Sequence, residues 1–223
     1  MKRVHGKSRK GLIVALTALT ISLLGIVAPL QAQVPAAQVV WQHVGRVYVN
    51  PNTGKALYAG YLVHINGLPT SLFNGAPSEA AAYFTFSTDV LSLTPLPANG
   101  DVGLSLVSAG TFNVYYNAVP SGDWNNPNSF SSGQLIVTFA RDESLLPQVG
   151  PIITHGLSEV LASSSKFAFA GQTYNFNKIA PNGITFAQYF STTPIITGVA
   201  DYPIALPGAG TTMSVGSGPK TDK

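Results

Sequence analysis

The residues best suited to hold a polar ligand lie in one long loop of the sequence. Residues 120–133 read PSGDWNNPNSFSSG and are almost all turn formers, apart from Trp124 and Phe130. An exposed tryptophan can stack on a sugar ring, while nearby carboxylate and amide groups hydrogen-bond to hydroxyls. We therefore expect the ligand-binding residues to be Asp123, Trp124, Asn125 and Asn126. The alternative is that Trp124 and Phe130 fold back onto the core, and that the Asp and Asn side chains only stabilise turns.

Three histidines beyond residue 32 are candidates for metal binding or proton transfer. His43 and His64 lie in adjacent predicted strands and could face each other, but neither has the acidic neighbour that usually orients a histidine ligand. His155 and Glu159 are four apart, a spacing that on a helix would place both on one face. In the 120–133 loop, the acids are too few for a calcium site. We therefore expect no metal and no cofactor.

Nucleophilic catalysis finds little support in the sequence. Residues 156–160 read GLSEV and approach a nucleophile elbow, but Val160 stands where the strained turn needs a second glycine. The chain has no cysteine, which excludes thiol nucleophiles, thiolate metal sites and disulfides. Acids and histidines are also scarce, so the composition favours a protein that is not an enzyme.

The elements that must position these residues are short strands. Residues 39–49 and 56–65 are rich in β-branched and aromatic residues and flank an Asn-Pro-Asn-Thr-Gly-Lys turn, which predicts a hairpin. Further strands are expected near residues 80–87, 91–93, 102–106, 111–119 and 134–141, then in a hairpin at 166–177, and at 184–190 and 195–199. The prolines at 95 and 97 are expected to end the strand at 91–93.

Turn signals about every ten residues predict an all-β fold. We expect an antiparallel β-sandwich or a small β-barrel of about eight to ten strands. Residues 154–164 fit a short helix or a strand equally well. The expected domain is a single unit over residues 39–207, between a flexible leader at 33–38 and a flexible polar tail at 208–223.

The N-terminus has the pattern of a signal peptide. Five basic residues fall within the first ten, and residues 11–30 carry no charge. We expect cleavage after Ala32, so that residues 1–32 are a signal peptide. A retained membrane anchor is the alternative, since about 20 apolar residues can span a bilayer. The mature protein is expected to be extracytoplasmic, either periplasmic or secreted.

Removal of residues 1–32 reverses the sign of the net charge. Seven basic and nine acidic residues remain, a net charge of −2 instead of +3. The remaining basic residues are scattered singly, so we expect no nucleic-acid partner and no membrane partner after cleavage. An outer-membrane barrel is compatible with the hairpins, but the internal prolines and the polar tail argue against it.

The function expected from the sequence is binding. We expect an exported, non-enzymatic β domain that binds a ligand, a surface polymer or a protein partner. The alternative is a small β-barrel enzyme of the cyclase or isomerase kind, with a mostly apolar pocket. That alternative requires a cavity that contains His64, His155 or Asp123.

Overall fold

A computed structural model describes residues 33–69 and 71–216 of the chain. The predicted signal peptide at residues 1–32 lies outside the described residues, as do residues 217–223 of the predicted tail. In the described part, the helical segments are η1 Glu79–Ala81, η2 Pro127–Ser131 and α2 Phe176–Ile179. The strands are β1 Val39–Asn50, β2 Lys55–Ile65, β3 Phe84–Thr88, β4 Leu91–Asn99, β5 Val102–Val107, β6 Gly110–Tyr116, β7 Gln134–Arg141, β8 Ser144–Val149, β9 Ile152–Ser164, β10 Phe167–Phe169, β11 Gln172–Tyr174, β12 Ile184–Ser191, β13 Ile195–Ile196 and β14 Ile204–Ser214.

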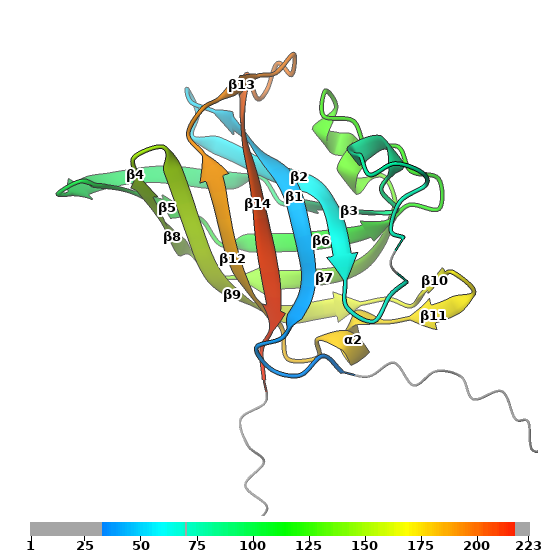
Figure 1. Cartoon of the computed structure of the whole chain (residues 1–223). Helices are drawn as coiled ribbons and strands as arrows, with labels where there is room; N and C mark the ends of the chain where they lie inside the picture. Colours follow the sequence, from blue (N-terminus) through cyan, green and yellow to red (C-terminus); the bar gives the residue numbers. More distant parts are fainter. Residues whose placement is uncertain (1–32, 70, 217–223) are drawn as a thin grey trace, which may run out of the picture. The chain divides into compact units, whose positions relative to one another are not determined.

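Eight antiparallel strands close into a barrel (Figure 1). Their order is β1–β14–β12–β9–β7–β6–β3–β2, and β2 pairs with β1 to complete the ring. The all-β prediction is confirmed, and of the two expected architectures the structure has the barrel. Closure leaves these strands without open edges, which stabilises a β-sheet protein that has no disulfides.

Strands β4, β5 and β8 continue three barrel strands beyond a kink. Each is separated from β3, β6 or β7 by two residues, at 89–90, 108–109 and 142–143. Past the kink, β4 pairs with β2, β5 lies between β4 and β8, and β8 pairs with β9. These three strands therefore form one wall of the space above the kink.

The barrel below the kink is filled by aromatic rings. The Trp41 ring is fully buried, and it lies within 5.7–6.1 Å, centroid to centroid, of Phe112, Phe139, Phe176 and Phe186. Each of these rings comes from a different strand or from α2. Such rings fill a small barrel without leaving space for solvent.

Residues 154–164 form a strand, not a helix. They belong to β9, in which His155, Leu157, Glu159 and Leu161 point inward in strict alternation. In a barrel wall, alternate side chains point into the barrel and out of it, so buried residues recur every two positions. An apolar spacing of four residues fits both a helix and a strand. The alternative of a short helix at this position is therefore wrong.

Two further differences concern where strands end. Strand β4 continues through Pro95 and Pro97 to Asn99, because beyond Ser92 it pairs only with β5 and leaves one edge open, where proline is tolerated. Where the sequence predicted a flexible tail from residue 208, strand β14 extends to Ser214 between β1 and β12. Likewise, Val34 in the predicted leader is buried and its amide donates to the carbonyl of Ile179.

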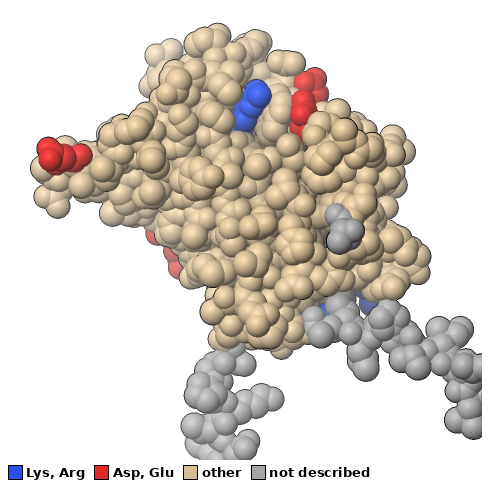
Figure 2. All heavy atoms as spheres, viewed as in Figure 1, with Lys and Arg blue, Asp and Glu red and all other residues tan. Residues whose placement is uncertain are grey.

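The surface carries few charges. Figure 2 shows a face on which isolated Lys, Arg, Asp and Glu side chains are separated by uncharged residues. This agrees with the charged fraction of 9% in the sequence. Recognition through a broad charged surface therefore has no support on this face.

Candidate functional site

A narrow apolar cavity lies in the barrel above the kink. It is lined by Val47, Val49, Ala56, Tyr58, Leu91, Leu93, Val107, Arg141, Leu146, Ile153, His155, Gln188, Phe190 and Leu206. Its volume is about 500 Å³ when the space out to the mouth is included, and the centres of water molecules can occupy about 60 Å³ of it. Ten of the fourteen lining residues are aliphatic or phenylalanine. The shape suits a slender apolar molecule.

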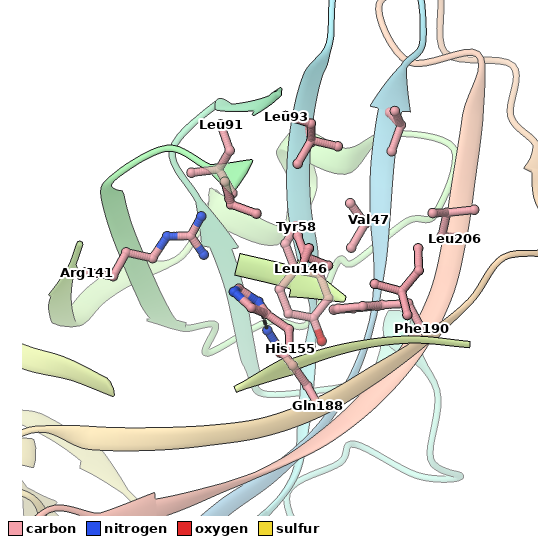
Figure 3. Close-up of a pocket in the computed structure, with 14 residues that line it drawn as sticks. Val47, Tyr58, Leu91, Leu93, Arg141, Leu146, His155, Gln188, Phe190 and Leu206 are labelled. Carbon is pink, nitrogen blue, oxygen red and sulfur yellow. Dashed lines mark hydrogen bonds between the residues drawn. The ribbon is translucent and has the colours of Figure 1, made fainter. Parts of the chain in front are cut away.

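Four polar residues line this cavity: Tyr58, Arg141, His155 and Gln188. Figure 3 shows His155 and Gln188 next to each other and hydrogen-bonded, whereas Arg141 extends towards the cavity from the side on which Leu91 is drawn. Gln188, His155 and Arg141 come from β12, β9 and β7, which are neighbours in the sheet, and closure of the barrel adds Tyr58 from β2. An apolar wall with a few convergent polar groups is the usual composition of a small-molecule site.

A buried chain of hydrogen bonds connects two histidines through a glutamine. Nε2 of His43 lies 3.3 Å from Oε1 of Gln188, and Nε2 of Gln188 lies 2.9 Å from Nδ1 of His155. The other ring nitrogen of His155, Nε2, lies 2.9 Å from the Ser144 hydroxyl. With the amide in this orientation, His43 donates to Gln188, Gln188 donates to His155 and His155 donates to Ser144. Both nitrogens of His155 are therefore occupied.

Gly210 makes this chain possible. His43 and Gln188 are not on neighbouring strands, because β14 runs between them and places Gly210 opposite both. A Cβ atom at Gly210 would lie 2.7 Å from Cε1 of His43 and 2.7 Å from Cβ of Gln188. Only glycine leaves the space through which the imidazole and the amide meet.

The Arg141 guanidinium is buried without a counter-ion. One terminal nitrogen donates to the carbonyl oxygen of Ser108 at 3.4 Å, and Nε has no hydrogen-bond partner. No carboxylate of the described residues lies within the 4.0 Å of an ion pair. Arg141 is only 7% exposed, although Arg side chains are almost never buried unless they are paired.

Burial keeps both histidines neutral. It lowers the pKa of His43 to about 4, although the hydrogen bond that His43 donates to Gln188 opposes this shift, and together with the charge of Arg141 it lowers the pKa of His155 to about 4. Burial raises the pKa of Glu159 to about 8, although Arg141 opposes this shift. Burial also raises the pKa of Tyr58 well above its ordinary value. At neutral pH, Arg141 is therefore the main charge beside the cavity.

The chain has no match among the proteins compared, which comprise protein-family models, curated proteins and solved structures. The described residues also contain no group of three His, Cys, Asp or Glu side chains suited to a metal ion. No helix among them is both long and apolar enough to cross a membrane. The function must therefore be argued from the cavity itself.

The predicted ligand-binding loop lies away from the cavity. Asp123, Asn125 and Asn126 are exposed, and none of them lines the cavity. The Asp123 carboxylate accepts from the Asn125 amide at 2.8 Å, and the Asn126 amide donates to the Asp123 carbonyl at 3.0 Å. These bonds stabilise the turn itself. That the loop binds a ligand stays a prediction.

Trp124 is packed on both sides. Its ring centroid lies 4.8 Å from that of Phe130 and 5.9 Å from that of Tyr61, and the Arg46 guanidinium lies 4.4 Å above the ring. The Trp124 carbonyl also accepts a hydrogen bond from the Tyr48 hydroxyl at 2.8 Å. A sugar could stack on this ring only after Arg46 had moved.

The structure separates His43 from His64 and links His43 to His155. His64 is exposed and lies opposite Gln42, whereas His43 is buried, so these two do not face each other. His43 and His155 are instead linked through Gln188. His155 and Glu159 do share the inner face of β9, because an even spacing keeps two residues on one face of a strand.

The sequence analysis missed Arg141 and Gln188. A signal for both was present: Gln188 follows Ile184 and Phe186 at two-residue spacing and precedes Phe190, and Arg141 follows Phe139 in the same way. A polar residue at an inward position of an amphipathic strand is either paired in the core or part of a site. Which of the two applies depends on what the other strands place opposite it.

Proposed function

We propose that the barrel binds a small, mostly apolar molecule in the cavity above the kink. The observation that carries this proposal is a mostly apolar cavity into which Arg141 and the hydrogen-bonded pair of His155 and Gln188 bring a few polar groups. Burying an apolar molecule there releases water from its surface, at about 25 cal/mol per Å² of apolar area. The polar groups would fix its orientation.

We also propose that this binding takes place outside the cytoplasm. The signal-peptide pattern of residues 1–32 supports this, as does the absence of cysteine, which makes the fold independent of the redox state of its surroundings. A surface polymer or a protein partner finds less support, because the Asp123 carboxylate already accepts from the backbone of its own turn and Arg46 lies over the Trp124 ring.

The test fills the cavity with a larger side chain that carries no charge. Leu146 lines it from β8, while its neighbour Leu145 is 42% exposed on the opposite face of the same strand. We expect the neutral dye N-phenyl-naphthylamine to fluoresce on binding to the wild-type protein. Leu146→Trp should reduce that binding at least tenfold, and the matched control Leu145→Trp should leave it unchanged. Equal effects of the two variants, or no dye binding to the wild type, would contradict the proposal.

An isomerase or cyclase that uses the same cavity is the second candidate. The observation in its favour is that His155 is neutral and borders the cavity, where an imidazole could take a proton from a carbon next to a carbonyl and return it elsewhere. Arg141 would stabilise the oxyanion. Both nitrogens of His155 already have partners, so binding remains the first candidate.

A simple conversion distinguishes the two candidates. Cyclohex-3-enone becomes the conjugated cyclohex-2-enone by such a proton transfer, and ultraviolet absorbance follows the product. An isomerase would accelerate this conversion in the wild type, and His155→Phe would abolish the acceleration. If the conversion is no faster than in buffer while the dye still binds, ligand binding is the only one of the two functions that remains.

A further inference from the structure

We infer that the ligand is a monocarboxylate with an unbranched apolar chain, bound with its carboxylate at Arg141 and its chain along β4, β5 and β8. This inference rests on the proposed function, since it names the class of molecule that the cavity takes. It depends on two independent features, a buried guanidinium without a counter-ion and an apolar groove that lies beside the cavity.

The guanidinium requires an anion that the described protein does not supply. Removing a charge from water is costly unless it is paired, and the contact with the Ser108 carbonyl is a long one. Arg presents its donors as a planar fork that matches the two oxygens of a carboxylate. Nε, one of those donors, is buried and has no partner among the described residues. A carboxylate in the cavity that Arg141 lines would supply the negative charge that the guanidinium lacks at contact distance.

The acids near Arg141 do not replace such an anion. Glu159 lies opposite Arg141 in the β7–β9 register, but it is buried and protonated over most of the population at neutral pH. Its Oε2 atom makes no hydrogen bond in the described part of the chain. Asp89 is exposed to solvent. Glu159 and Asp89 therefore offset the positive charge of Arg141 only in part, while burial still lowers the pKa of its guanidinium, and neither acid is in contact with it.

A single guanidinium selects a singly charged head group. A phosphate monoester carries about 1.5 to 2 charges at neutral pH, and only one cation faces it here. The other polar groups, His155 and Gln188, are uncharged and already bonded to each other. A sugar would find few free hydroxyl partners in the cavity, chiefly Tyr58. A carboxylate carries one negative charge, which equals the single positive charge of Arg141.

The path for the chain is a second hollow that adjoins the cavity. It is lined by Leu93, Leu96, Gly103, Leu104, Ser105, Leu146, Gln148 and Ile153. Leu93, Leu146 and Ile153 line both hollows, so the two lie side by side along β4, β8 and β9. From Leu91 to Leu96 the path along β4 is about 17 Å, at about 3.4 Å per residue. A slender chain fits this length, whereas a broad ring system does not fit the narrow cavity.

The experiment compares head groups that share one chain. We would measure displacement of N-phenyl-naphthylamine from the mature protein by dodecanoate, dodecanol and dodecylammonium. We expect dodecanoate to bind at least tenfold more tightly than dodecanol, and dodecylammonium to bind most weakly. Arg141→Met should remove the preference for dodecanoate and leave dodecanol binding unchanged. Since these three ligands are compared on the wild type, the result does not depend on how well the variant folds.

Chain length provides the second measurement. Each added methylene should tighten binding by about threefold to fourfold from octanoate to dodecanoate. Leu104→Gln should reduce this increment, while Leu145→Trp, on the outer face of β8, should not. Equal affinity for the three head groups would overturn the inference while the proposed function stands. Failure of the dye itself to bind would overturn the proposed function.

Discussion

The two ends of the barrel are built from the same strands but are filled differently. On β1, Trp41 closes the end below the kink, whereas Val47 lines the cavity above it. On β12, Phe186 belongs to the filled end and Phe190 to the cavity end. The hydrogen-bonded layer through His43, Gln188 and His155 lies between the two ends.

We infer that the filled end provides stability and that the cavity end provides binding. The filled end buries large rings against one another, so it should supply most of the stability. The cavity end has smaller side chains, an unpaired cation and space for a ligand. Sites for binding are commonly less well packed than the core that supports them. If the two ends differ in this way, changes at the filled end should reduce stability more than changes at the cavity end.

Truncation of one large side chain at each end should have unequal effects. Trp41→Ala removes a fully buried ring that contacts four others, and should lower the free energy of unfolding by about 3–5 kcal/mol. Leu206→Ala removes a side chain that is only partly buried and should cost about 2 kcal/mol, the lower end of the range for leucine truncation. Urea denaturation measures both. Equal losses would mean that the cavity end is as important for stability as the filled end.

Addition of one methyl group should disrupt the layer between the ends. Gly210→Ala places a Cβ about where the His43 ring and the Gln188 side chain meet, and should destabilise the protein by about 1–3 kcal/mol. Gly150→Ala, at a turn with nothing within 4 Å of the new Cβ but with a positive φ of 55°, controls for the loss of glycine itself. A smaller loss for Gly210→Ala than for Gly150→Ala would contradict this interpretation.

The buried titratable groups predict a stability maximum near pH 6.5. Burial lowers the pKa of His43 and of His155 from 6.5 to about 4. As the pH falls from 6.5 towards 4, these two histidines therefore take up protons in the unfolded chain before they do so in the folded protein, and the free energy of unfolding decreases. Glu159 has its pKa raised from 4.5 to about 8, so its contribution is lost as the pH rises through 8. Between 4.5 and 6.5 two histidines outweigh one glutamate, and above 6.5 only the glutamate acts.

Urea denaturation across this pH range measures the maximum. In Glu159→Gln, the decline above pH 6.5 should disappear while the decline towards acid pH remains. A wild-type stability that continues to rise through pH 8 would show that Glu159 ionises normally, and it would also weaken the case that Arg141 lacks a counter-charge.

The smallest expected effect is at the exposed loop. Trp124→Ala removes contacts with Phe130, Tyr61 and Arg46 and should cost about 1 kcal/mol of stability. Dye binding in the cavity should not change. If Trp124→Ala instead abolished retention of the protein on an immobilised polysaccharide, the loop predicted from the sequence would be the binding site.

The hairpins were predictable because their signals are local. The turns at residues 50–55 and 99–101 contain Asn and Gly residues that adopt positive φ or short turns, and the strands beside them alternate. Strand β9 was ambiguous because a four-residue spacing fits two periodicities. The continuation of β4 through two prolines depended on an open edge, which no local pattern reveals.

The sequence by itself determined the all-β class, most strand positions and the low surface charge, because alternation, turn chemistry and composition are properties of short segments. Only the tertiary structure decided the site. Arg141, His155 and Gln188 are separated by up to 47 positions and adjoin one cavity because three strands meet around a closed barrel. The order in which strands pair is set by packing across the whole barrel, and no short segment specifies it.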